Sequence, residues 1–176
     1  MSRDKAILEQ DGELFDLAGE VVRLAEAAGI TLGCAESCTG GLVSGCLTAI
    51  RGSSAVVRGG VVSYAIPVKH EVLGVPYEGV LSDPGIGAVS SECAEAMACG
   101  ARDVLRCDVA VSTTGIAGPG GDEPGKPVGT VWFGAAWHGQ SRSHVRCFDG
   151  DRADVRRFAC REALSFMREV IVELSS

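Results

Sequence analysis

Segments with the periodicity of an amphipathic helix alternate with short apolar strands along most of this chain. Residues 12–29 carry apolar side chains three and four positions apart, as one face of a helix requires, and residues 30–36 follow as an apolar strand. The alternation continues to a last helical segment that starts at Asp151. Such alternation is typical of parallel strands covered by helices, so we predict an α/β fold, a three-layer α/β/α sandwich around a mostly parallel, mixed sheet.

The remaining segments follow the same pattern until a late hairpin. Further helices are expected over residues 39–50, 67–74 and 90–106, and further strands over 56–64, 108–114, 128–137 and 143–148. A turn joins the last two strands, which predicts that they pair antiparallel. Residues 75–89 are expected to form mostly loop with one strand, and 115–127 a long loop rich in glycine and proline. No repeat or linker interrupts the chain, which predicts one domain over residues 1–176 with a core of about 12–172.

Charge and composition argue against several classes of partner. The net charge is −7 and no run of Lys or Arg is present, which disfavours a nucleic-acid groove or an anionic membrane surface. Two Trp, two Tyr and five Phe leave few stacking platforms for bases. No stretch reaches the roughly 18 apolar residues of a membrane span, and the N-terminal residues are too charged for a secretory signal, so we predict a cytoplasmic protein.

The eight cysteines lack the spacing of a metal site. None forms a C-x-x-C pair, and none of the three histidines stands at a C-x-x-H spacing. We therefore expect no metal, and in a reducing compartment we expect most of the thiols to pack as small buried side chains.

Polar side chains follow three of the predicted strands and indicate a site. In open α/β sheets ligands bind at the carboxyl ends of the strands, where Ser37, Tyr64, Lys69 and Thr114 could meet. A lysine in a dry pocket has a lowered pKa and can accept the proton of a serine nucleophile. Backbone N–H groups after Ser37 would offer an oxyanion hole or a phosphate seat.

Each of these residues also has a purely structural interpretation. Ser37 could cap the helix that follows it, Lys69 could be a solvated charge, and Tyr64 a core aromatic with a bonded hydroxyl. Cys38 is a rival nucleophile or a packed small residue, and Glu36 is expected to be a structural hydrogen-bond partner rather than a general base. The residues alone therefore predict an α/β domain with either a hydrolase site or a phosphate site.

Eight short stretches in order give the chain a resemblance to a known family. They are "AESCTGGL", "GSS", "GGVVSYAIPVK", "LGV", "GAVS", "TGIAGPGG", "KPVGTVWFG" and "FDGDRADVRR". Over about residues 12–172 the chain resembles the CinA C-terminal domain family, whose characterised members are nicotinamide mononucleotide amidohydrolases. The resemblance implies a three-layer α/β/α fold and hydrolysis of nicotinamide mononucleotide to nicotinic acid mononucleotide and ammonia, in pyridine nucleotide recycling, without a metal or organic cofactor.

The resemblance also assigns expected roles to individual residues. It implies that Ser37 is the nucleophile, Lys69 the general base and Tyr64 a supporting hydroxyl. The residues that it places at the substrate are Thr39, Gly40, Gly41, Thr114, Gly115 and Arg152. The first three would supply backbone N–H groups, and Arg152 is expected at the phosphate because a guanidinium matches phosphate geometry.

Two segments depart from the family pattern, and other functions stay open. Residues 65–68 read "AIPV" where many members carry an asparagine, and residues 76–90 differ from the usual loop. The alternatives are a catalytically silent nucleotide-binding module and an interaction module in DNA uptake or damage responses. An intact Ser37, Tyr64 and Lys69 favours the enzyme. We expect a stand-alone homodimer that binds a small nucleotide, with no nucleic-acid or membrane partner.

Overall fold

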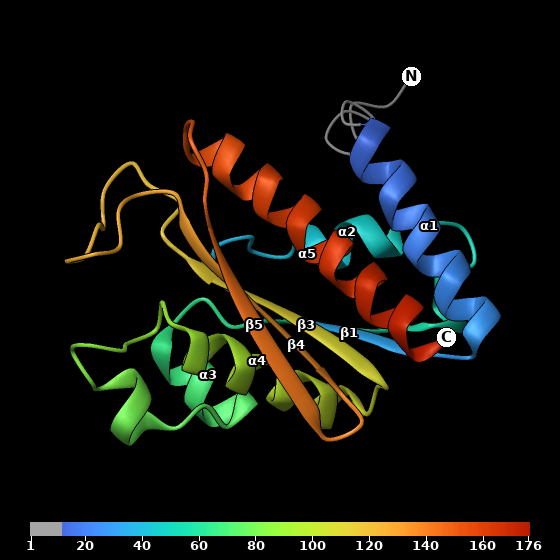
Figure 1. Cartoon of the computed structure of the whole chain (residues 1–176), viewed down its shortest axis with the longest axis horizontal. Helices are drawn as coiled ribbons and strands as arrows, with labels where there is room; N and C mark the ends of the chain where they lie inside the picture. Colours follow the sequence, from blue (N-terminus) through green and yellow to red (C-terminus); the bar gives the residue numbers. More distant parts are fainter. Residues whose placement is uncertain (1–11) are drawn as a thin grey trace.

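A five-stranded mixed sheet forms the centre of the computed structural model, which describes residues 12–176 (Figure 1). The strand order is β2-β1-β3-β4-β5. Strand β1 (Leu32–Glu36) pairs in parallel with both β2 (Val57–Val62) and β3 (Val109–Gly115). Strands β4 (Thr130–Trp137) and β5 (Gln140–Cys147) extend the sheet as an antiparallel hairpin beside β3. The predicted α/β class, with a parallel core and a late hairpin, is confirmed.

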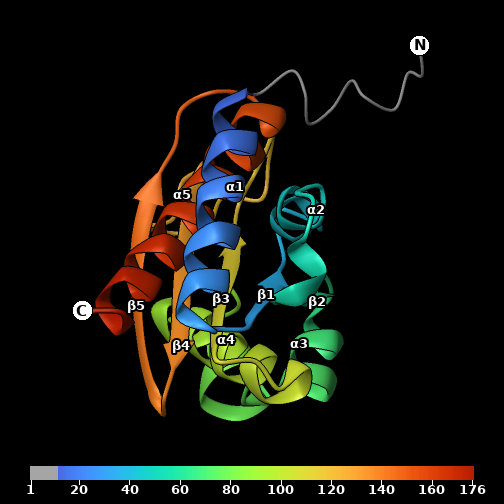
Figure 2. The same ribbon diagram turned by 90° about the vertical axis from the view of Figure 1, so that its right-hand side faces the viewer.

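Helices cover both faces of this sheet (Figures 1 and 2). Helices α1 (Gly12–Ala28), α2 (Leu42–Thr48) and α5 (Arg152–Leu174) pack together on one face, and α3 (Ile66–Leu73) and α4 (Ser91–Leu105) pack on the other. The larger apolar cluster lies under α1 and α5, and a smaller one lies under α4. Because both faces are covered, β1 is buried along its whole length, as parallel strands usually are.

Several helix ends fall where the sequence predicts them. Gly29 follows α1 in a left-handed conformation, with φ of 67°. Ser90 caps α4 by accepting a hydrogen bond from the Cys93 N–H. Asp151 caps α5 and forms a reciprocal capping box with Asp154. These side chains satisfy N–H groups that a helix leaves without partners in its first turn.

Two expected elements differ from the observed ones. Helix α2 begins at Leu42 rather than Thr39, because Gly40 and Gly41 have φ of 61° and 97° and cannot belong to a right-handed helix. Residues 75–89, all of them described, form loops and turns in place of the expected strand. Within Tyr77–Leu81, Glu78 and Gly79 have non-helical dihedral angles. In the described part of the chain, no helix is long and apolar enough to cross a bilayer.

The cysteines are free thiols, and most of them are buried. Six are buried, Cys99 is half-buried, and only Cys147 is exposed. The prediction that most of them pack as small apolar side chains is confirmed.

Candidate active site

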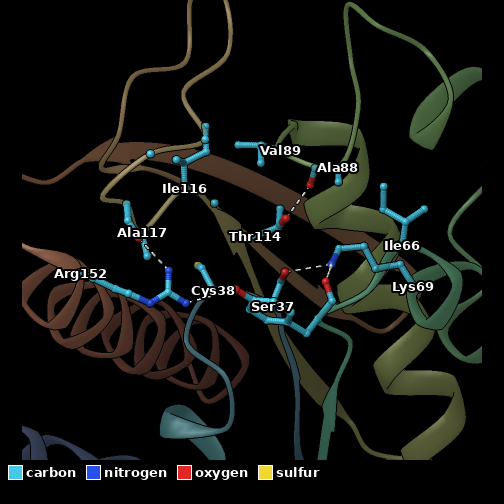
Figure 3. A pocket seen from close by; sticks show the side chains of 15 residues that line it. Ser37, Cys38, Ile66, Lys69, Ala88, Val89, Thr114, Ile116, Ala117 and Arg152 are labelled. Atoms are coloured by element: carbon cyan, nitrogen blue, oxygen red, sulfur yellow. Dashed lines mark hydrogen bonds between the residues drawn. The ribbon is translucent and has the colours of Figure 1, made fainter.

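The carboxyl ends of the three parallel strands open into a cavity of about 270 Å³ (Figure 3). Of the residues expected at a site, the lining includes Ser37, Tyr64, Lys69, Thr114, Gly115 and Arg152. Apolar side chains and glycines of the loop after β3, between residues 116 and 121, form another wall. The sheet edge therefore brings together Ser37, Tyr64, Lys69 and Thr114, as their positions at the ends of the parallel strands predict. Arg152 joins them from α5.

Ser37 is the first residue after β1 and is held by the neighbouring strand. Its N–H donates to the Thr113 carbonyl at 2.9 Å, and the residue is buried with 9% of its surface exposed. It does not cap α2, whose N-cap is Gly41 and has no side-chain hydrogen bond. The capping interpretation of Ser37 is therefore wrong, and its hydroxyl is available to the cavity.

Glu36, the last residue of β1, caps the start of α2 with its side chain. Its fully buried carboxylate accepts hydrogen bonds from the N–H groups of Gly41, Val43 and Ser44. The hydroxyl of Thr39 also donates to it, at 2.7 Å. These contacts confirm the structural role expected for Glu36, and they fix the turn that carries Ser37 against the start of α2.

Lys69 reaches Ser37 from α3. Its Nζ lies 2.9 Å from the Ser37 Oγ (Figure 3). It also donates to the carbonyls of Ser63 at 2.5 Å and Tyr64 at 3.4 Å. Only 1% of the Lys69 surface is exposed. The interpretation of Lys69 as a solvated charge is therefore wrong.

The surroundings of Lys69 favour its neutral form. Burial lowers the pKa of its ammonium group, and the thiols of Cys93 and Cys38 oppose that shift. Within residues 12–176 Lys69 forms no ion pair, and its three hydrogen-bond partners are a hydroxyl and two carbonyls. A neutral amine has two N–H donors and one lone pair, so the donors can serve the two carbonyls while the lone pair faces the Ser37 hydroxyl.

Tyr64 and Arg152 meet at the mouth of the cavity. Tyr64 has 61% of its surface exposed, so it is not a core aromatic. Its hydroxyl accepts a hydrogen bond from Arg152 Nη2 at 3.1 Å, and Arg152 Nη1 donates to the Gly118 carbonyl at 2.9 Å. Tyr64 contacts Lys69 through its backbone carbonyl, whereas its hydroxyl is bonded to Arg152.

Thr114 and Gly115 line the cavity at the end of β3. The Thr114 hydroxyl donates to the Ala88 carbonyl at 2.5 Å, so its lone pairs remain to accept a hydrogen bond from a ligand. A Cβ on Gly115 would lie 2.5 Å from the Thr130 carbonyl oxygen of β4. Glycine is therefore required at 115 by the close approach of the neighbouring strand.

The three residues expected to supply backbone N–H groups to a substrate lie outside the cavity lining. The N–H of Gly40 donates to the Ser37 carbonyl at 3.1 Å, and that of Gly41 donates to Glu36 at 2.9 Å. The protein therefore uses the N–H donors of both glycines itself. Among residues 12–176, the backbone N–H groups of Cys38 and Thr39 have no acceptor on another residue, so they are the donors left beside Ser37.

Cys38 also lines the cavity but is a poor rival nucleophile. Burial raises the pKa of its thiol to about 11. The thiolate is the reactive form of cysteine, and at neutral pH it is scarce at such a pKa.

Sequence reasoning missed Arg156, which donates from α5 to the carbonyls of Cys38 and Thr39. Two signals could have found it: Arg156 lies in the stretch "FDGDRADVRR", and it stands four residues after Arg152, on the same helix face. Nothing local to the turn at Cys38 indicates a partner so distant in sequence.

Comparisons with known proteins identify the family of this chain. The model of the CinA C-terminal domain matches residues 14–171. A CinA-like protein of Geobacter metallireducens is 44% identical over 162 residues, which cover 92% of this chain but 38% of that protein. The chain thus spans about two fifths of the length of such curated relatives. Nicotinamide-nucleotide amidohydrolase PncC of Escherichia coli is 44% identical over 155 residues, which cover 88% of this chain and 92% of that enzyme.

Solved structures are similar over nearly the whole chain. The competence damage-inducible protein A (ComA) from Klebsiella pneumoniae has a TM-score of 0.83 at 37% identity, covering 89% of this chain and 95% of its own. The competence/damage inducible protein CihA from Agrobacterium tumefaciens has a TM-score of 0.83 at 40% identity, covering 94% and 97%. The fold is therefore shared with these proteins.

Proposed function

The chain belongs to the CinA C-terminal domain family, and from that premise we propose that it is an amidohydrolase that releases ammonia from the carboxamide of nicotinamide mononucleotide. The support is the similarity to the Escherichia coli nicotinamide-nucleotide amidohydrolase, which this chain covers almost fully. The observation that carries the chemistry is the 2.9 Å distance between Lys69 Nζ and Ser37 Oγ. Action in the cytoplasm, in pyridine nucleotide recycling and as a homodimer belongs to the same proposal.

In the first step, Ser37 attacks the carboxamide carbon. Neutral Lys69 takes the hydroxyl proton as the bond from Oγ to that carbon forms, and the electron pair of the carbonyl moves to its oxygen. The oxyanion accepts hydrogen bonds from the N–H groups of Cys38 and Thr39, the unused donors of the turn. The burial that lowers the pKa of Lys69 suits it to this role, because an ammonium ion cannot accept a proton.

The next steps return the enzyme to its starting state. The bond between carbon and nitrogen breaks, and the leaving amide nitrogen takes the proton from Lys69 to depart as ammonia. Water then attacks the ester on Ser37, gives one proton to Lys69, and releases nicotinic acid mononucleotide as the Ser37 oxygen regains that proton. Each proton passes through Lys69, and the sequence of steps uses no metal or organic cofactor.

The mouth of the cavity is the place that we assign to the substrate phosphate. Arg152 is exposed there, and its guanidinium has five N–H donors, of which two go to Gly118 and Tyr64. The rest remain for phosphate oxygens. We assign Tyr64 a supporting role, in which its hydroxyl holds Arg152 and its carbonyl holds Lys69, while Thr114 and Gly115 contact the substrate at the end of β3.

The test is ammonia release from nicotinamide mononucleotide by the purified protein, with identification of the acid product. The assay is run with and without a metal chelator, beside Ser37→Ala and the exposed control Ser54→Ala. Release that resists the chelator, persists in the control and disappears in Ser37→Ala is the expected result. Binding of the nucleotide without any release would reject the enzyme and support a nucleotide-binding module.

A further inference from the structure

One side chain of α5 holds the turn that follows Ser37. The guanidinium of Arg156 donates through Nε to the Cys38 carbonyl at 3.2 Å and through Nη2 to the Thr39 carbonyl at 2.9 Å. Arg156 is separated from Thr39 by 117 residues in sequence, so the tertiary fold sets this contact. The planar guanidinium group thereby holds two successive peptide groups.

Fixing the carbonyls of the turn also fixes its N–H groups. In a trans peptide the C=O and the N–H point in opposite directions, so the contact of Arg156 with the Cys38 carbonyl turns the Thr39 N–H away from the guanidinium. The peptide between Ser37 and Cys38 is held in turn by the Gly40 N–H, which donates to the Ser37 carbonyl at 3.1 Å. The hydrogen bonds to the carbonyls of Ser37 and Cys38 therefore set the orientations of the N–H groups in the same two peptide bonds, those of Cys38 and Thr39.

Among residues 12–176, these two N–H groups are unusual in lacking an acceptor on another residue. Thr39 is fully buried and Cys38 is 4% exposed, yet neither N–H has an acceptor on another residue among residues 12–176. Buried N–H groups without a partner are rare because their desolvation is costly. Two such donors directly after Ser37 are what an oxyanion needs, and the positive charge behind the carbonyls strengthens them as donors.

We propose that Arg156 is a positioning residue, which holds the oxyanion site of Ser37 through the carbonyls of Cys38 and Thr39. The proposal rests on the proposed amide hydrolysis. Arg156 does not line the cavity of Ser37. It lines a neighbouring cavity of about 610 Å³ together with Arg152, so a direct contact with the substrate phosphate is the competing role to be tested.

The experiment compares Arg156→Ala and Arg156→Lys with the wild type and with Arg161→Ala. Arg161 is the control because it lies on the same helix and pairs only with Glu13 among residues 12–176, at 3.5 Å. For each protein kcat and KM are measured with nicotinamide mononucleotide. The dissociation constant is measured separately in the Ser37→Ala background, where turnover does not interfere. Thermal unfolding of each variant checks that it is folded.

We expect kcat of Arg156→Ala to fall roughly 10- to 100-fold, less than the loss of an oxyanion donor itself, with the dissociation constant nearly unchanged. Arg156→Lys should recover part of the rate, because a lysine ammonium keeps the positive charge but does not match the geometry of the two guanidinium hydrogen bonds. Added guanidinium ion should raise the rate of Arg156→Ala and leave that of Arg161→Ala unchanged. Either an unchanged kcat, or a loss confined to the dissociation constant, would overturn the positioning role.

A second experiment tests the positioning role of Arg156 independently of the proposed substrate. If the wild type releases no ammonia from nicotinamide mononucleotide, Ser37 is labelled with phenylmethanesulfonyl fluoride and the adduct is followed by mass spectrometry. Slower labelling in Arg156→Ala than in the wild type would support the positioning role while the substrate assignment fails. Equal labelling would overturn it, and a wild-type serine that resists the reagent would overturn both proposals.

Discussion

The side-chain nitrogen of Lys69 lies 2.9 Å from the hydroxyl oxygen of Ser37, although 32 residues separate the two in sequence. Two backbone carbonyls, of Ser63 and Tyr64, occupy the other directions around that nitrogen. No carboxylate of residues 12–176 pairs with this nitrogen, and burial lowers the pKa of the amine. In the proposed mechanism, Lys69 therefore serves Ser37 as a base in place of a histidine.

Replacing Ser37 by alanine should abolish turnover and leave nucleotide binding nearly intact. The substitution removes the attacking oxygen but no donor that we assign to the nucleotide. Ammonia release and isothermal titration calorimetry with nicotinamide mononucleotide measure the two properties. Turnover that survives in Ser37→Ala would instead point to Cys38, the other nucleophile in the cavity lining.

Replacing Lys69 by methionine should lower kcat at neutral pH by roughly 10²- to 10⁴-fold, the usual contribution of a general base. Methionine fills much of the same buried space, so the fold should be retained. Glu71→Gln is the matched control, because Glu71 is an exposed residue of the same helix. An unchanged rate in Lys69→Met would exclude lysine as the base.

The pH dependence of kcat/KM should follow the neutral form of Lys69. Burial lowers the pKa of this group, so the neutral base becomes populated at a lower pH than for a solvated lysine. The rate should therefore rise with pH through that lowered pKa and level off above it. A rate that falls as pH rises through neutrality would mean that the protonated form is required.

Arg152→Ala should raise KM for nicotinamide mononucleotide by roughly 10- to 100-fold, as expected for loss of hydrogen bonds to a charged group. The effect on kcat should be smaller, because Arg152 lies at the mouth of the cavity, bonded to Tyr64 and Gly118. Nicotinamide riboside, which lacks the phosphate, provides the comparison. If Arg152→Ala raised KM equally for the nucleotide and the riboside, Arg152 would not bind the phosphate.

The sequence predicts the residues of this site better than the contacts among them. Ser37 follows β1, Lys69 lies on the helix after β2, and Thr114 lies near the end of β3. The rule that ligands bind at the carboxyl ends of parallel strands brings them to one edge. The alternation of helices and strands likewise predicts the layers of the fold. Burial of Lys69 is different, because it depends on how α3 packs against the sheet and the neighbouring segments, which a short amphipathic pattern does not specify.

The turn after Ser37 shows why the remaining contacts were not predicted. Gly40 and Gly41 look like N–H donors for a ligand, but their left-handed conformations direct them to acceptors in the protein. The same turn is held by two residues outside it. Glu36, on a strand, accepts from its N–H groups, and Arg156, on a distant helix, donates to its carbonyls. Such contacts are set by tertiary structure, and no local pattern encodes them.

The most direct test of the account is an NMR titration of the lysine side chains. The chain contains three lysines, Lys5, Lys69 and Lys126, so protein labelled with ¹³C at lysine Cε gives few signals, and Lys69→Met assigns the relevant one. The account predicts that Lys69 titrates below the ordinary range of a lysine ammonium. A Lys69 that stays protonated up to that ordinary range would contradict its role as the base of Ser37.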